Sequence, residues 1–300
     1  TARRHCRTGG IPALAAAACH STRRGRDRDF SNLSGLSEEE PIAMILCLDV
    51  GNSQIYCGVY EGERLALQFR RTSTMRSSSD EIGVFLRGAL RENGVQPESV
   101  TQIAICSVVP DMLYSLRSCC QKYFQLEPLV IRPGVKTGLK IDYKDPKEVG
   151  ADRIIDALGA VTLYPGRNLI VIDFGTATTV CAIRKDRTFL GGNIIPGVRL
   201  AMEALEEKTA QLPSVEIVPV QSAIGRSTVE SIQNGLYWSN VGMVKELVRR
   251  ITDEAFRDSE APMVISTGGF AHLFDAEDLF DAVIPDLILQ GLREAVRLNT

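Results

Sequence analysis

The sequence contains one short pattern twice, and this internal repeat limits the possible folds more than any other feature. In each copy a short apolar run ends in Asp, a glycine turn follows, and a second β-rich run returns. The two copies are ILCLDV-GNS-QIYCGVY from residue 45 and LIVIDF-GTA-TTVCAI from residue 169. An offset of 124 positions superposes Asp49 on Asp173 and Gly51 on Gly175. Each copy predicts a β-hairpin, and one hairpin per half predicts two similar lobes, 44–164 and 165–300.

The rest of the sequence alternates between helical and strand-like segments. Apolar residues at helical spacing predict helices over 79–93, 112–123, 151–164, 198–209, 227–257 and 287–298. Short apolar runs predict strands over 100–109, 129–131 and 263–266. This alternation predicts the α/β class, with sheets that are covered by helices.

Composition argues against several classes of protein. The chain has 34 Lys and Arg against 37 Asp and Glu, whereas a general nucleic-acid binder needs a basic stripe. The longest strongly apolar run, residues 11–19, is about half a membrane span, so neither nucleic acid nor membrane is an expected partner. Eight cysteines without a C-x-x-C pair are typical of buried free thiols in the cytoplasm.

Residues 1–43 differ in composition from the rest. They hold seven Arg, no Lys and five acidic residues and carry a charge of +2, whereas residues 44–300 carry −5. Two interpretations stay open, an organelle transit peptide and a remnant of sequence upstream of Met44. Under both, the segment is expected to be flexible and to contribute no chemistry.

The two glycine turns have the composition of a phosphate-binding site. Glycine permits close approach of the backbone, N–H groups and a hydroxyl hold phosphate oxygens, and Asp acts through water on a divalent cation. For one turn alone, an Asp that stabilises the turn is the simpler interpretation. For the pair with Asp49 and Asp173, we favour a nucleotide-phosphate site. A third turn, Thr267-Gly268-Gly269, suits contact with a base or ribose but is unspecific by itself.

A second group of polar residues stands where the helix 151–164 begins. Gly150 ends a loop, and Asp152 and Arg153 fall in the first turn of the helix, where the helix dipole and free N–H groups favour anions. Asp152 has two interpretations. It is an ordinary helix-start carboxylate, or it is a base that accepts a hydroxyl proton while Arg153 holds substrate or phosphoryl charge.

Other conspicuous residues are mostly assigned structural roles. Arg70, Arg71 and Arg76 lie in a Ser/Thr-rich stretch that predicts a solvated loop or, alternatively, a mobile flap near phosphate. His272 is expected on a surface loop. Trp238 is expected in the core or in a dimer interface.

Six motifs in order carry a family resemblance. They are ILCLDVGNS, PKEVGADRIIDALGAV, LIVIDFGTATT, GGNIIPGV, AIGRSTVESIQNG and ISTGGFA. Together, from Met44 to about Leu298, the sequence resembles the type III pantothenate kinases of the acetate and sugar kinase, heat-shock chaperone ATPase and actin superfamily. The resemblance implies an α/β fold of duplicated ribonuclease-H-like (actin-like ATPase) domains with a nucleotide cleft between them. It also implies ATP-dependent phosphorylation of pantothenate, the first step of coenzyme A biosynthesis, by a homodimer that uses ATP, Mg²⁺ and K⁺ or NH₄⁺.

The resemblance implies roles for individual residues as well. Asp152 would be the general base, Asp173 the monovalent-cation ligand, and Asp49 a group that acts on Mg²⁺ through phosphate or water. The ATP contacts would be Asp49, Val50, Gly51, Asn52, Ser53, Gln54, Ile55, Tyr56 and Thr176. The pantothenate contacts would be Tyr143, Gly150, Ala151, Asp152, Arg153 and, near the dimer interface, Thr228. Ser53 stands where the family often has Thr, and it keeps the hydroxyl.

Two other functions stay open on the sequence. A non-catalytic regulatory or accessory protein on the same scaffold predicts loss of the functional aspartates, whereas Asp49, Asp152 and Asp173 are all present. Another small-molecule kinase of the superfamily would lack the linked GADR and AIGRST motifs. A P-loop kinase is disfavoured because the sequence has no G-x-x-x-x-G-K-[ST] motif.

Overall fold

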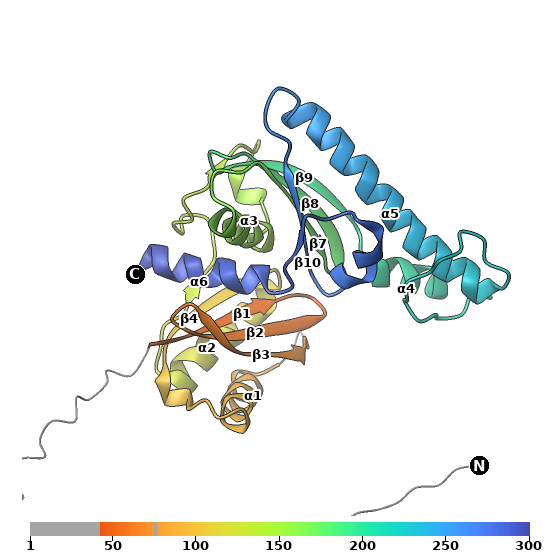
Figure 1. The fold of residues 1–300 in the computed structure, drawn as a ribbon. Helices are drawn as coiled ribbons and strands as arrows, with labels where there is room; N and C mark the ends of the chain where they lie inside the picture. Colours follow the sequence, from red (N-terminus) through yellow and green to blue (C-terminus); the bar gives the residue numbers. More distant parts are fainter. Residues whose placement is uncertain (1–42, 75–76) are drawn as a thin grey trace, which may run out of the picture. The chain divides into compact units, whose positions relative to one another are not determined.

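The computed structural model describes residues 43–74 and 77–300, and their strands form two sheets (Figure 1). The strands of the first sheet are β1 Met44–Val50, β2 Gln54–Glu61, β3 Arg64–Thr72, β4 Val100–Ser107 and β5 Leu129–Val130. They lie in the order β3-β2-β1-β4-β5. The first three in the chain form an antiparallel meander, while β4 is parallel to β1 and β5 is parallel to β4.

The second sheet repeats this arrangement. Its strands are β6 Lys140–Ile141, β7 Leu169–Phe174, β8 Ala177–Ile183, β9 Thr188–Pro196, β10 Met263–Thr267 and β11 Ala282–Val283. Strands β9-β8-β7-β10-β11 follow the order and the directions of the first sheet, and β6 adds a further strand beside β9. Because the same topology occurs twice, the predicted α/β fold with duplicated ribonuclease-H-like domains is confirmed.

Six helices and three short 3₁₀ segments accompany the described strands. The helices are α1 Ser79–Glu92, α2 Pro110–Phe124, α3 Ala151–Leu163, α4 Val198–Lys208, α5 Thr228–Ala255 and α6 Leu287–Asn299. The 3₁₀ segments are η1 Pro97–Ser99, η2 Pro146–Glu148 and η3 Ala271–Glu277. All helices predicted from the apolar spacing are present. Local signals explain some of their starts: α1 follows a capping box formed by Ser78 and Glu81, and Ser227 caps α5.

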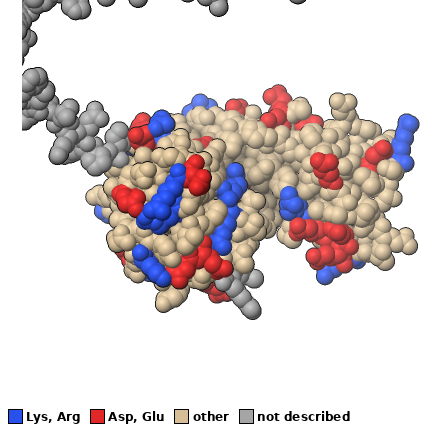
Figure 2. Space-filling view, turned by 90° about the horizontal axis from the view of Figure 1, so that it is seen from below, with Lys and Arg blue, Asp and Glu red and all other residues tan. Residues whose placement is uncertain are grey.

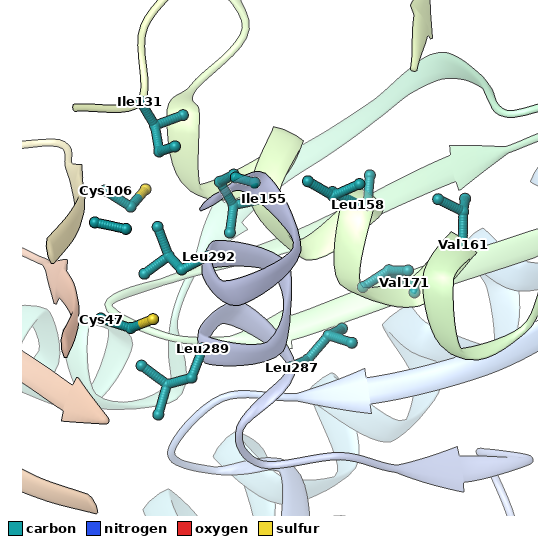
Figure 3. Close-up of a cluster of buried hydrophobic side chains, with 14 of the residues drawn as sticks. Cys47, Cys106, Ile131, Ile155, Leu158, Val161, Val171, Leu287, Leu289 and Leu292 are labelled. Atoms are coloured by element: carbon teal, nitrogen blue, oxygen red, sulfur yellow. The ribbon is translucent and has the colours of Figure 1, made fainter. Parts of the chain in front are cut away.

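Three apolar cores hold these elements together. One lies between the first sheet and helices α1 and α2, and another lies between the second sheet and helices α4 and α5. The third core contains residues from both sheets and from α3 and α6. Figure 3 shows Leu289 and Leu292 of α6 directed toward Cys47 and Cys106 of the first sheet, with Ile155 of α3 close by. The two halves therefore share one core, built around α3 and α6.

Helices α3 and α6 pack against each other at backbone distance. A Cβ atom on Gly159 of α3 would lie 2.6 Å from the carbonyl oxygen of Leu287. A Cβ atom on Gly291 of α6 would overlap the carbonyl oxygen of Ile155. Larger side chains at either position would push the helices apart, so these glycines set the contact between the halves.

The structure corrects one sequence prediction and leaves others untested. Arg70 and Arg71 do not lie in a loop, because strand β3 continues to Thr72. Arg76 and the composition-biased segment, apart from Ala43, lie outside the described residues. The lobe boundary at 164 and 165 stays a prediction; β6 precedes it yet joins the second sheet, and α6 follows it yet packs against β1 and β4.

The surface and the thiols agree with the composition. The face drawn in Figure 2 carries acidic and basic side chains mixed together. The six cysteines that the structure describes are all free and buried, as predicted. His272 is exposed as predicted, although it lies in the 3₁₀ segment η3, where its Nδ1 is 2.9 Å from Oδ2 of Asp275. No helix in the described part of the chain combines the length and the apolar character that a membrane span needs.

Candidate active site

The two repeated turns meet in space. Asp49 is the penultimate residue of β1 and Asp173 is the penultimate residue of β7. The exposed turns that follow these strands touch through their hydroxyl groups, with Ser53 Oγ 3.0 Å from Thr176 Oγ1. Residues that are 123 positions apart in the sequence thus form one site. The turns present hydroxyl and backbone N–H groups, which is the chemistry that holds phosphate oxygens.

The first turn is held by backbone hydrogen bonds at both sides. Gly51 N–H donates to the carbonyl oxygen of Gln54 at 3.0 Å and closes the hairpin. Ser73 N–H, just beyond the end of β3, donates to the carbonyl oxygen of Ser53 at 2.9 Å. The turn is therefore fixed to two strands before any ligand binds, which lowers the entropy cost of binding.

The carboxylate of Asp173 lies between two glycines. A Cβ atom on Gly175 would be 3.3 Å from its Oδ2. A Cβ atom on Gly268 would collide with its Oδ1 and would be 2.7 Å from backbone atoms of Phe174. Gly268 also has φ +91°, a conformation that favours glycine. The turn that the sequence left unspecific thus has a definite role, because it leaves room for Asp173.

Asp152 stands at the start of α3, as predicted. Its Oδ1 accepts a hydrogen bond of 2.8 Å from the backbone N–H of Arg153, so the carboxylate interacts with the N-terminal end of the helix. Gly150 precedes the helix, and a Cβ atom there would collide with the same oxygen. Asp152 is only partly buried, which leaves it accessible to a substrate hydroxyl.

Arg153 is a buried cation whose guanidinium is only partly satisfied. It is 5% exposed, its Nε donates to Cys181 Sγ at 3.3 Å, and its Cζ lies 5.5 Å from the centre of the Phe189 ring. Its Nη2 has no hydrogen-bond partner. Since burying an unpaired charge is costly, this geometry suits an anionic ligand.

Tyr143 lines an open pocket near this arginine. The pocket has a volume of about 430 Å³ and is lined by Asp142, Tyr143, Lys144, Glu148 and Leu190. This volume is within the range of small-molecule sites. The Tyr143 ring packs over Gly191, where a Cβ atom would be 3.1 Å from the ring.

Not every predicted site residue is brought together with the others. Thr228 is the exposed first residue of α5, and no hydrogen bond in the described part of the chain joins it to another predicted site residue. Trp238 donates from Nε1 to the carbonyl oxygen of Ser222 at 3.1 Å and is partly buried on α5. This places Trp238 among packing residues.

Burial and neighbouring carboxylates raise three carboxyl pKa values at the centre of the site, those of Asp49, Asp156 and Asp173. Burial, followed by the charges of Asp173 and Asp152, raises the pKa of Asp49 to about 8. Burial and the charge of Asp152 raise the pKa of Asp173 to about 7. Asp156 is 4% exposed, and its pKa is raised by burial and then by the charges of Asp173, Asp152 and Asp49. Its Oδ1 has no hydrogen-bond partner.

Sequence reasoning missed Asp156. The available signal was its spacing, because it lies four residues after Asp152 and thus on the same face of α3. Because its pKa is raised, this carboxyl group ionises readily only beside a positive charge, so it offers a further oxygen ligand for a bound cation. Within residues 43–74 and 77–300, no three His, Cys, Asp or Glu side chains converge to hold a metal ion by themselves. The orphaned oxygen of Asp156 and the carboxylate chemistry nevertheless suit a hard cation that takes its other ligands from phosphate, hydroxyl or water.

The raised pKa values predict how stability depends on pH. In the unfolded chain these carboxyls lose their protons near pH 3.8, whereas in the folded protein Asp173 and Asp49 keep theirs up to about 7 and 8. Unfolding therefore releases protons, and without added cations we expect stability to fall as pH rises toward 8. The expected loss is about 1 kcal/mol or more between about pH 6 and 8. Thermal unfolding across this range measures it.

Two comparisons test that expectation. MgCl₂ should restore stability more at the higher pH, since a cation stabilises the ionised carboxylates. Asp156→Asn keeps the shape of the side chain but removes one titrating group, so its stability should vary less with pH. A pH dependence that is identical in the variant would contradict the interpretation.

Comparisons with known proteins agree with the geometry. The family model described as type III pantothenate kinase matches residues 45–250. The type III pantothenate kinase of Legionella pneumophila (strain Paris) is 55% identical over 257 residues, which cover 86% of this chain and 100% of that protein. Type III pantothenate kinase 1 of Francisella tularensis subsp. holarctica (strain OSU18) is 45% identical over 256 residues, which cover 85% and 100%.

A solved structure shows the same fold. A Campylobacter jejuni protein described as a Baf family transcriptional activator has a TM-score of 0.54. The match covers 84% of this chain and 97% of that one, at 18% identity. At such low identity the likeness shows the fold alone.

Proposed function

The chain belongs to the type III pantothenate kinase family, and from this premise we propose how its own residues carry out the reaction. The reaction is the ATP-dependent phosphorylation of pantothenate in coenzyme A biosynthesis. Phosphoryl transfer depends mainly on positioning and on stabilising charge. The site therefore has to hold the phosphates, orient the acceptor hydroxyl and remove its proton.

The paired turns bind the phosphates of ATP in this proposal. The contact of 3.0 Å between Ser53 Oγ and Thr176 Oγ1 is the observation that carries the proposal, because it joins the phosphate turns of both halves. Residues Asp49 to Tyr56 supply the first set of contacts and Thr176 supplies the second. A triphosphate that enters between the hydroxyls would replace their mutual hydrogen bond by bonds to phosphate oxygens.

Asp152 acts as the general base on the pantothenate hydroxyl. Its carboxylate is accessible at the start of α3, and its Oδ1 is held by the N–H of Arg153. A primary alcohol is a weak nucleophile, so a carboxylate that accepts its proton accelerates the attack on phosphorus. Gly150 leaves room for this carboxylate, because a Cβ atom there would collide with its Oδ1, and Ala151 is proposed as a further substrate contact.

Arg153 and Tyr143 hold the rest of pantothenate. The unpartnered Nη2 of buried Arg153 suits the carboxylate or another oxygen of the substrate. Tyr143 lines the pocket of about 430 Å³ and would contact the part of pantothenate that enters it. A carboxylate of the substrate would form an ion pair with the Arg153 guanidinium and would give its Nη2 a hydrogen-bond partner.

Cations complete the site in this proposal. Asp49 would hold Mg²⁺ through phosphate oxygens or water, and Asp173 would bind K⁺ or NH₄⁺. Bound cations neutralise phosphate charge during transfer. The chain's part is to supply carboxylates that become fully ionised only when a cation is near, as the raised pKa values of Asp49 and Asp173 indicate.

We propose that the protein works as a cytoplasmic homodimer. Apolar side chains are exposed around α4 and the start of α5, among them Ile194 at 66% and Ile224 at 76%. Exposed apolar groups of this size are typical of interaction surfaces. Thr228 begins α5 beside them and would contact pantothenate near this interface. Light scattering coupled to gel filtration tests the dimer, and a monomeric mass would contradict it.

Coupled ADP release with ATP and pantothenate tests the assignment of function. Turnover should require pantothenate, should need Mg²⁺, and should rise when K⁺ replaces a large organic cation. Turnover with another alcohol, but not with pantothenate, would point to a different acceptor. Folded protein that binds ATP without any turnover would support a regulatory role.

A further inference from the structure

A row of three side chains crosses the first sheet next to the phosphate turn. In the strand register, Arg70 of β3 stands opposite Tyr56 of β2, and Tyr56 stands opposite Asp49 of β1. Directly paired residues project from the same face of a sheet. Arg70 therefore lies on the same face as Asp49, the face that contributes Tyr56 and Cys47 to the core shared by both halves.

Tyr56 fixes the position of the arginine. The Cζ atom of Arg70 lies 3.9 Å from the centre of the Tyr56 ring, within the range of a cation–π contact. The ring itself is buried, and its hydroxyl donates to Oε1 of Gln68 at 2.5 Å. A stacked guanidinium loses little further freedom when it binds a ligand, because its plane is already oriented.

Arg70 keeps its charge available for a ligand. Its side chain is exposed, and it forms no ion pair with a carboxylate among the described residues. Arg64 on the same strand behaves differently, since it pairs with Glu61. Burial, and after it the charges of Asp286 and Asp49, raise the pKa of Tyr56. Neither carboxylate forms an ion pair with Arg70.

The end of β3 is tied to the phosphate turn. Ser73, three residues after Arg70, donates its N–H to the carbonyl oxygen of Ser53 at 2.9 Å. The centre of the site also holds the carboxyl groups of Asp49, Asp152 and Asp173, which carry negative charge whenever they are ionised. An ATP triphosphate that binds at Ser53 would meet repulsion there unless cationic groups compensate it. The planar guanidinium of arginine suits phosphate oxygens through paired hydrogen bonds.

We propose that Arg70 binds the terminal phosphate of ATP and holds the γ-phosphoryl group in line for transfer. The proposal rests on the phosphate site at Ser53 and Thr176 described above. Tyr56 then has two tasks, since it supports both the hairpin and the orientation of the guanidinium. The sequence predicted that this arginine lies in a solvated loop or a mobile flap, whereas the proposal makes it a phosphate ligand on strand β3.

Nucleotide binding and turnover of three variants test the proposal. In Arg70→Gln, the Kd of a fluorescent ATP analogue and the KM for ATP should rise about 10- to 100-fold, as for the loss of a charge-assisted hydrogen bond. The Kd for the corresponding ADP analogue should change much less, and the KM for pantothenate should stay within about 2-fold. Arg70→Lys keeps the charge without the planar fork and should recover part of the ATP affinity.

Arg64→Gln is the matched control, because it removes the same charge from the other end of the same strand. It should bind ATP like the unaltered protein. Equal ATP affinity in Arg70→Gln and the control would overturn the proposal, and so would an equal loss for ATP and ADP. Binding is measured without pantothenate, so a protein that lacks pantothenate turnover but shows these affinities would refute the kinase assignment and leave the role of Arg70 intact.

Discussion

Asp152→Asn is expected to lower kcat for pantothenate phosphorylation by about 10²- to 10⁴-fold, which is the usual contribution of a general base. Asn has nearly the same shape and can still accept the hydrogen bond from Arg153 N–H, so the start of α3 should be preserved. What it loses is the capacity to take the hydroxyl proton. Steady-state kinetics with ATP and pantothenate measure the effect.

Binding experiments separate this loss from a structural defect. The variant should keep its affinity for ATP, because the phosphate turns at Ser53 and Thr176 are not altered. Full activity in Asp152→Asn would preserve the enzyme but remove Asp152 as its base. Weakened ATP binding would instead indicate a structural role for Asp152.

Gly268→Ala is expected to lower both the free energy of unfolding and the activity of the protein. The new Cβ atom would collide with Oδ1 of Asp173 and would lie 2.7 Å from backbone atoms of Phe174. The position also has φ +91°, which is strained for any residue with a side chain. Strain and overpacking together cost about 2–4 kcal/mol. Thermal or denaturant unfolding measures this loss, and activation by K⁺ reports the displacement of Asp173.

The next residue offers a matched control. A Cβ atom on Gly269 would meet no atom within 4 Å, and Gly269 is not among the glycines with positive φ. Gly269→Ala should therefore change stability by less than about 0.5 kcal/mol and should leave activation by K⁺ unchanged. Equal effects of the two substitutions would show that the contact with Asp173 is not what Gly268 provides.

The sequence predicts the parts of the fold that have a strong local pattern. An apolar run, an Asp and a glycine turn predict each of the two hairpins, and apolar residues at helical spacing predict the helices. Strand β3 was missed because it is an edge strand with one polar face, and its arginines resemble a loop. Strand β9 was missed because it contains Gly191 and Gly192, which usually indicate turns. In the structure these glycines let Tyr143 and the backbone of Val180 approach closely.

Only those site residues that belong to sequence motifs with a recognised role could be predicted. Asp49, Asp152 and Asp173 belong to recognisable motifs, and the contact between Ser53 and Thr176 joins the turns that follow Asp49 and Asp173. Asp156 lies inside the motif PKEVGADRIIDALGAV, but the motif gave it no role, and Arg70 lies in none of the six motifs. Their surroundings depend on which face of α3 turns toward the sheets and on how β3 pairs with β2, and both are decided by tertiary packing.

The position of α6 has a consequence for how the chain folds during its synthesis. Leu289 and Leu292 cover Cys47 and Cys106 in the first sheet, yet α6 is the last helix of the described sequence to leave the ribosome. Until then the part of the inner face over β1 lacks its helix, even though α3 already packs against β4 and α1 and α2 already cover the other face. Until α6 is synthesised, an elongating chain is thus more exposed to aggregation or more dependent on chaperones. Helix α6 completes the cover of this face, so nascent chains arrested before α6 should be more sensitive to protease in the first sheet than released protein.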